Sequence, residues 1–146
     1  MKNEFDGLKL ENQLCFPLYA ASKEVIRRYR PILEEIDLTY TQYITLLVLW
    51  ENQQLNVKEL GKRLYLDSGT LTPVLKYLER KGLLVRSRLQ RDERNLEVKL
   101  TEKGYALKKE AEKVPARVAK SLNLTAKEMN ELQNALYKIL ASNADD

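Results

Sequence analysis

The stretch that decides the fold of this chain is LDSGTLTPVLKYLERKG, residues 66–82. Apolar side chains recur in it at helical spacing and predict a helix over about residues 68–81 with one core-facing stripe: Leu71, Val74, Leu75 and Leu78. Gly82 ends this helix, because glycine readily adopts the conformation that follows a helix C-terminus. At its start either Asp67 or Thr70 is expected to be the cap, since Pro73 is well tolerated only in a first turn.

The opposite face of this predicted helix is polar, with hydroxyls near its start and cations further along: Ser68, Thr70, Thr72, Lys76, Tyr77 and Arg80. Small hydroxyls let the backbone approach bases and phosphates closely, and a helix N-terminus favours an anion. Residues 76–94 hold seven Lys and Arg side chains against three acidic ones, which suits a phosphate backbone. A solvated charged surface is the plainer interpretation of the same residues.

The neighbouring residues predict a winged helix-turn-helix over about residues 39–100. Asn56, followed by Glu59, predicts the cap of a short helix before the one already described. Residues 96–100 alternate between apolar and polar as a half-buried strand does, and residues 84–89 are a plausible antiparallel partner across a charged loop at 90–95. In such a unit the second helix enters the major groove of DNA and the hairpin loop reaches the adjacent minor groove.

Helices are predicted on both sides of this unit. A long first helix covers about residues 14–36, and Pro17 fits it best if the helix starts close to Cys15. Pro115 must kink or end the helix that follows the hairpin. Three further helices begin at threonines: Thr39, Thr101 and Thr125. The chain is therefore predicted to be mainly α with a small β-hairpin wing, in one domain over residues 1–146.

Composition narrows the class of protein. An apolar content of 44% and a charged content of 32% are typical of a soluble globular chain. The first fifteen residues carry five charged side chains, and the longest apolar run, residues 44–50, is too short for a bilayer. We therefore expect no secretory segment and no membrane span. A free thiol fits a reducing compartment, so a cytoplasmic protein is expected.

Cys15 is the one cysteine of a chain that has no histidine. A lone thiol forms no intramolecular disulfide, and a chain without histidine has no imidazole base and no imidazole metal ligand. We therefore expect no metal and no cofactor, and a regulator instead of an enzyme. A thiol peroxidase is the enzymatic alternative: Arg27 and Arg28 are available to it, but the resolving thiol that it normally needs is lacking. In the plainest interpretation Cys15 is a small buried hydrophobe.

Two motifs resemble the MarR family of winged-helix repressors: LDSGTLTP at residues 66–73 and RDER at residues 91–94. The segment LENQLCF at residues 10–16 is similar to the branch of organic hydroperoxide resistance repressors with one sensing cysteine. The resemblance covers essentially the whole chain. It implies a homodimer, joined by helices at about residues 10–37 and 101–142, on a near-palindromic double-stranded DNA operator that is released when the cysteine is oxidised.

The same resemblance assigns site residues. It places the reactive thiol on Cys15 and its tyrosine partners on Tyr29 and Tyr40. It places the DNA contacts of the recognition helix and the wing on five residues: Asp67, Ser68, Thr70, Lys76 and Arg94. Asp92 is expected to hold the Arg94 guanidinium ready for a narrow minor groove. Position in the helix and the wing adds four candidates to this interface: Thr72, Arg86, Arg91 and Asp92.

Helix geometry separates Cys15 from Tyr29 within one chain. Fourteen residues make nearly four turns, so the two side chains share a face but lie about 21 Å apart. In an antiparallel pairing of two copies centred on residue 22, each Tyr29 would meet the partner subunit's Cys15, as two-fold symmetry allows. Small residues at positions 20–22 let two helices approach there. We predict a thiol site shared between subunits, with Tyr19, one turn from Cys15, as the same-chain candidate.

The expected signal is an organic hydroperoxide. The thiolate is the nucleophile toward a peroxide oxygen, and phenol hydroxyls that donate hydrogen bonds favour the thiolate over the thiol. Oxidation gives a sulfenic acid, which condenses with a low-molecular-weight thiol to a mixed disulfide. A bulky adduct is expected to shift the paired helices and spoil the spacing of the two reading heads. The alternative keeps the DNA-binding fold but makes a small aromatic ligand the signal, with Cys15 only packing.

Overall fold

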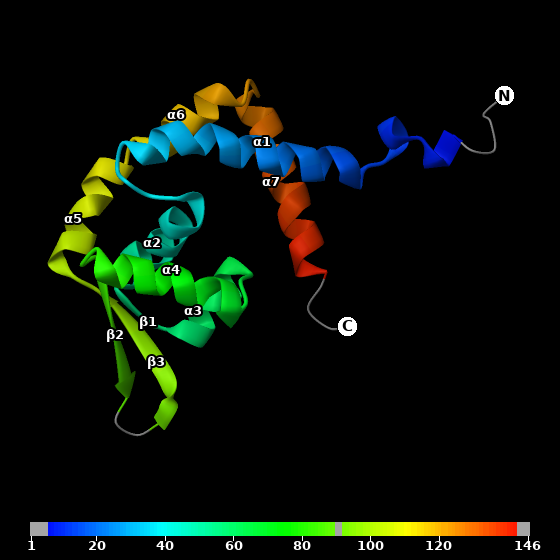
Figure 1. Cartoon of the computed structure of the whole chain (residues 1–146). Coiled ribbons are helices and arrows are strands. Elements are labelled where there is room, and N and C mark those ends of the chain that lie inside the picture. The colour runs from blue at the N-terminus through cyan, green and yellow to red at the C-terminus, as the bar shows by residue number, and fades with distance from the viewer. Residues whose placement is uncertain (1–5, 90–91, 143–146) are drawn as a thin grey trace.

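The computed structural model describes residues 6–89 and 92–142 (Figure 1). After the 3-10 helices η1 (Asp6–Leu8) and η2 (Leu10–Asn12), the elements follow in this order: α1 (Cys15–Glu34), α2 (Tyr40–Asn52), β1 (Gln54–Asn56), α3 (Val57–Leu64), α4 (Ser68–Arg80), β2 (Leu84–Leu89), β3 (Asp92–Leu100), α5 (Glu102–Ala111), α6 (Val114–Ser121) and α7 (Ala126–Ala141). Helices α1 and α6 pack side by side at one end of the molecule, and the β2–β3 hairpin projects at the other (Figure 1). Helices α3 and α4 with this hairpin confirm the predicted winged helix-turn-helix.

The helix ends explain where each element starts. The predicted threonine caps are confirmed by hydrogen bonds from backbone N–H groups to the hydroxyls of Thr39, Thr101 and Thr125. Helix α4 is capped by Asp67, whose Oδ1 accepts the Thr70 N–H at 2.7 Å. Thr70 as the cap is therefore wrong, because it is already the third residue of the helix. Helix α1 begins at Cys15, which puts Pro17 in its first turn, and Pro115 is the second residue of α6, after the predicted break.

The sheet has three strands in the order β1-β3-β2, where the sequence predicted two. Strand β1 pairs antiparallel with β3, with Leu55 opposite Val98, and leads directly into α3. The predicted loop at residues 90–95 is too long, because β3 begins at Asp92, which pairs with Leu89 across a register shift. A backbone ladder does not require apolar alternation, so charged residues extend the strand beyond the pattern that predicted it. Arg94, expected at the loop tip, therefore lies within β3.

The apolar stripe of α4 seats the helix in the core. Leu71, Leu75 and Leu78 are at most 1% exposed, and Val74 is half-buried beside them. They belong to one cluster with side chains of α2: Tyr43, Leu46, Leu49 and Trp50. Burying each leucine contributes about 2 kcal/mol. Because the stripe fixes the rotation of α4 about its own axis, the polar face is held outward.

Helix α5 is locked against α2 and the turn after α4. Trp50 Nε1 donates a buried hydrogen bond of 2.9 Å to the Gly104 carbonyl. A Cβ on Gly104 would lie 2.0 Å from the Leu83 carbonyl oxygen, so only glycine fits at this crossing. The Thr101 hydroxyl donates to the Gly82 carbonyl at 2.6 Å. These contacts join the DNA-reading unit to the outer helices.

The first half of α1 and all of α7 have no buried side chain. They instead expose large apolar residues, including Phe16, Leu18, Leu132, Tyr137 and Ile139, and Leu14 just before α1 is exposed as well. Among the residues that the structure describes, no helix combines the length and the apolarity that crossing a membrane requires.

Candidate DNA interface and thiol site

Helix α4 presents the predicted recognition face. Ser68, Thr70 and Lys76 are exposed, and Thr72 is half-buried between them. The Asp67 carboxylate is bonded into the start of this helix, where hydrogen bonds from the Thr70 backbone and hydroxyl hold the pKa of Asp67 below its usual range. The carboxylate therefore stays ionised at neutral pH and fixes the turn that carries the small hydroxyls. Its direct contact with DNA remains a prediction.

Cations gather at the other end of α4. The Tyr77 ring lies 5.9 Å from the Arg80 guanidinium carbon and 5.0 Å from Lys81 Nζ. Lys81 is also paired with Asp37 in the turn after α1, with Nζ 3.0 Å from Oδ2. Arg80 and Lys76 are exposed, and no ion pair to either is found over residues 6–89 and 92–142. These two side chains are the cations of α4 that can meet phosphates.

Of the four predicted wing residues, the structure describes the side chain of Arg86 alone. Arg86, on β2, is held by Glu79 of α4, with Nη2 3.2 Å from Oε1. Asp92 and Arg94 lie in β3, but their side chains are outside the described part of the structure, as is the whole of Arg91. The predicted contacts of these four residues with DNA are not tested by the structure.

A groove that the sequence did not single out, with two lysines in its lining, lies beside the start of α4. It encloses about 680 Å³ between α3 and α4, and its walls include Lys58, Lys62, Asp67 and Ser68. Both lysines are exposed and stand one turn apart on α3. The signal was in the sequence: two lysines four residues apart on the first helix of a helix-turn-helix, the helix that crosses the DNA backbone.

The thiol of Cys15 is exposed at the first residue of α1. Its neighbours Leu14 and Phe16 are exposed as well, at 83% and 41%. Tyr19, one turn further, is 58% exposed, and its ring carries the Lys23 ammonium at 4.3 Å from the centroid. In a single subunit the thiol therefore lies on an open apolar surface.

The other two predicted tyrosines form a cluster well away from the chain's own thiol. Tyr29 on α1 lies 4.8 Å from Tyr40 and 5.8 Å from Tyr43, between ring centroids. Burial, followed by the neighbouring rings of Tyr40 and Tyr43, raises the pKa of Tyr29 to about 12, and burial also raises the pKa of Tyr40. Both phenols are therefore protonated at neutral pH and can donate hydrogen bonds. Because α1 is one helix between Cys15 and Tyr29, about 21 Å separates them.

Tyr43 was missed as a member of this cluster. It follows Tyr40 by three residues and is 3% exposed, so it supports the two half-buried rings from the core side. The spacing of Tyr40 and Tyr43 on one helix face was the available signal.

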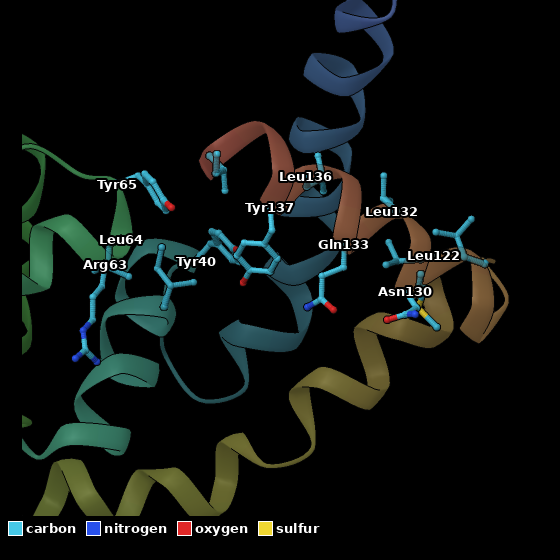
Figure 2. Close-up of a pocket in the computed structure, with 14 residues that line it drawn as sticks. Tyr40, Arg63, Leu64, Tyr65, Leu122, Asn130, Leu132, Gln133, Leu136 and Tyr137 are labelled. Carbon is cyan, nitrogen blue, oxygen red and sulfur yellow. The ribbon is translucent and has the colours of Figure 1, made fainter. Parts of the chain in front are cut away.

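A pocket of about 740 Å³ opens between α2, the end of α3 and α7 (Figure 2). Tyr40 lines it on one side, and Leu132, Leu136 and Tyr137 of α7 line it on the other. The lining is mostly apolar, with Arg63 at one edge. One member of the tyrosine cluster is thus reached from an open apolar recess.

Comparison with known proteins gives consistent matches along the chain. A family profile described as transcriptional regulator SarA/Rot matches residues 27–111. The organic hydroperoxide resistance transcriptional regulator of Bacillus subtilis is 47% identical over 140 residues, covering 96% of this chain and 95% of that protein. AbfR is a protein of Staphylococcus epidermidis. The structure of reduced AbfR bound to DNA is 34% identical to this chain with a TM-score of 0.77, and the match covers 96% of this chain and 98% of the other.

A MarR variant from E. coli, solved with operator DNA, is 27% identical with a TM-score of 0.79, covering 95% of this chain and 99% of that one. The winged helix-turn-helix with its exposed polar recognition helix, shared with proteins solved on DNA, defines a DNA-binding transcriptional regulator. The chain belongs to the MarR family, and its identity with the Bacillus subtilis protein places it with the organic hydroperoxide resistance regulators of that family.

Proposed function

We propose that this protein is a homodimeric repressor that holds a near-palindromic operator while Cys15 is reduced and releases it when an organic hydroperoxide oxidises that thiol. The observation that carries the proposal is that a thiol and a cluster of phenols, which together would make one sensing site, lie at opposite ends of the same helix. An exposed thiol stands at the start of α1, and a cluster of protonated phenols packs against its second half. A second copy of the chain would bring a thiol to the phenols and phenols to the thiol.

An antiparallel pairing of two α1 helices supports this arrangement. Residues 20–22, at the centre of such a crossing, are all exposed in the single subunit, and all are small. The apolar side chains around the thiol, among them Leu14 and Phe16, would be removed from water together with the exposed face of α7. In this pairing the partner subunit's Cys15 comes to Tyr29 and, through the recess lined by Tyr40, to the second phenol.

The reaction uses the thiolate as nucleophile. The Cys15 sulfur attacks the terminal oxygen of the hydroperoxide, the O–O bond breaks, and the organic part leaves as an alkoxide that takes up a proton to become an alcohol. The sulfur is left as a sulfenic acid. A low-molecular-weight thiol then attacks that sulfur, forming a mixed disulfide and releasing water. Phenols that donate to the thiolate favour the first step, because they stabilise the reactive anion.

Release of DNA follows from the connection between α1 and α4. Asp37, in the turn after α1, accepts a hydrogen bond through its backbone carbonyl from the Lys81 ammonium and pairs with the same ammonium through its carboxylate. Lys81 directly follows α4. A shift of α1 is therefore passed to the recognition helix. Two recognition helices must lie about 34 Å apart to enter successive major grooves, so a displaced pair loses affinity.

The DNA contacts proposed are those of the polar α4 face and the wing: Asp67, Ser68, Thr70, Thr72, Lys76, Arg91, Asp92 and Arg94. Arg86, the remaining candidate from the sequence, is held by Glu79 and is therefore not counted among these contacts. AbfR has been solved on DNA in a reduced form at 34% identity and in an overoxidised form at 32% identity, both with a TM-score of 0.77. Because both of these forms are on DNA, the pair supports a regulator of this fold that binds DNA and undergoes oxidation, and the proposed release of DNA rests on the connection between α1 and α4.

The second candidate is a repressor induced by a small aromatic ligand, with Cys15 structural. The apolar recess of about 740 Å³ beside Tyr40 and Tyr137 is the observation that favours it.

A gel shift on the protein's own promoter separates the thiol mechanism from the ligand mechanism. We expect cumene hydroperoxide to release the wild type and to leave Cys15→Ser bound. Release of Cys15→Ser by the peroxide would contradict the thiol mechanism, and an inducer response that survives iodoacetamide treatment would favour the ligand.

A further inference from the structure

The wing is fastened to the recognition helix by one carboxylate. Glu79, in the last turn of α4, accepts hydrogen bonds from the Arg86 backbone N–H at 2.9 Å, from Nη2 at 3.2 Å and from Nε at 3.4 Å. The Arg86 side chain is only 21% exposed and that of Glu79 36%. The Arg86 guanidinium and its backbone N–H hold the pKa of Glu79 below its usual range, so the contact is an ion pair at neutral pH. The Glu79 carboxylate therefore holds both the side chain and the backbone of Arg86 in β2.

The wing is anchored in the core at its base by Leu84 and Val98, both fully buried, and Glu79 adds a contact further out between α4 and the wing. The connection between them is a short turn, in which Gly82 has a φ of 77° and Leu83 N–H bonds back to the Leu78 carbonyl at 3.0 Å. Within the described residues, β2 is an edge strand that pairs only with β3, because the order of the sheet is β1-β3-β2. Glu79 reaches Arg86 beyond that turn, at the third residue of the strand.

We propose that Glu79 is a positioning residue for DNA binding: by holding Arg86 it sets the wing at the angle at which α4 and the wing enter adjacent grooves together. Arg86 then acts through Glu79 and not by contact with a phosphate. This inference rests on the DNA-binding part of the proposed function and is independent of the thiol.

A positioning role and a phosphate-contact role of Arg86 predict opposite changes in DNA affinity when Glu79 is replaced by Gln. Glu79→Gln removes a negative charge near the DNA surface, which by electrostatics alone strengthens binding to phosphates. If Arg86 were a phosphate contact, the substitution would also free its guanidinium and strengthen binding further. A positioning role predicts the reverse, because the wing loses its orientation.

The test is fluorescence anisotropy with two operator duplexes. One carries the full operator, and the other lacks the outer base pairs that the wings reach but keeps both recognition-helix half-sites. We expect Glu79→Gln to bind the full duplex about fivefold more weakly than wild type and the truncated duplex equally well. Arg86→Lys, which keeps the cation but not the forked contact, is expected to lose part of the same affinity.

The matched control is Glu35→Gln. Glu35 also makes a two-point ion pair between elements, with Arg117 Nη1 at 2.5 Å and Nη2 at 3.0 Å, but it joins the end of α1 to α6. It is expected to bind both duplexes like wild type. Unchanged or tighter binding of the full duplex by Glu79→Gln overturns the proposal, and so does an equal loss on both duplexes, which marks a general loss of fold. Failure of the wild type to bind either duplex would instead overturn DNA binding itself.

Discussion

Lys76→Ala tests whether α4 lies against the DNA backbone. Lys76 is exposed on the polar face of the helix, one turn beyond Thr72, and no ion pair to it is found within residues 6–89 and 92–142. Its ammonium is therefore free to neutralise a phosphate. Since this side chain is exposed, the substitution is expected to leave the fold and its thermal midpoint unchanged.

The magnitude follows from counterion release. Each neutralised phosphate contributes about 0.9 to the slope of log K against log salt concentration. A homodimer carries Lys76 twice, so the variant's slope is expected to be shallower by about 1.8. Raising the salt from about 50 to about 200 mM should then weaken the wild type about twelvefold more than the variant.

The assay is operator binding by anisotropy over that salt range. Lys127→Ala is the matched control, because Lys127 is equally a lysine on a helix surface, 85% exposed, but lies on α7 away from the recognition helix. Its slope is expected to equal that of the wild type. A slope for Lys76→Ala that equals the wild-type slope would refute the placement of this helix face on phosphates, and a halved effect would point to a bound monomer.

Three further predictions concern the core, the tyrosine cluster and the groove. Trp50→Phe removes the buried bond to the Gly104 carbonyl and is expected to cost about 2 kcal/mol, which lowers the thermal midpoint by about 4–8 °C in a calorimetric scan; an unchanged midpoint would contradict that bond's role. Because the pKa of Tyr29 is raised to about 12, the stability that its neutral phenol gives is complete below about pH 10 and lost as the pH rises through about 12. In an ultraviolet titration Tyr29→Phe should lack the last phenol to ionise, and an identical curve would count against burial of that ring. Lys62→Ala is expected to make the salt slope of operator binding shallower, as for Lys76→Ala, and no change would remove the groove beside α4 from the interface.

Much of the fold was readable because its determinants are local. The spacing of Leu71, Leu75 and Leu78 predicted the recognition helix and its buried side, and the threonine caps predicted the starts of other helices. Strand β1 was not predictable because three residues are too few to establish an alternation, and the strand exists only through pairing with β3, far along the chain. The cap of α4 was left open between Asp67 and Thr70 because Pro73 was expected near the helix start. Pro73 is in fact the sixth residue of the helix, where it has no N–H to donate to the carbonyl of Gly69.

For the candidate site, the positions along one helix were predictable from the sequence, and the contacts between elements were not. Helix geometry alone separated Cys15 from Tyr29, and the structure keeps both on one continuous helix. The grouping of Tyr29 with Tyr40 and Tyr43 depends on how α1 packs across α2, which no local pattern encodes. The same holds for Arg86, because its partner Glu79 lies in a different element, on the other side of the turn between α4 and β2.

The central claim is that each sensing thiol is activated by a tyrosine of the other subunit, and a mixed dimer tests it most directly. One protomer carries Cys15→Ser and its partner carries Tyr29→Phe, and the heterodimer is isolated with two different affinity tags. It holds one thiol, on the protomer that lacks the Tyr29 hydroxyl, facing a protomer that keeps it. We predict that this thiol is alkylated by iodoacetamide at pH 7 as fast as in the wild type, whereas the Tyr29→Phe homodimer reacts slowly. Alkylation of the heterodimer at the slow rate of that homodimer would contradict the account.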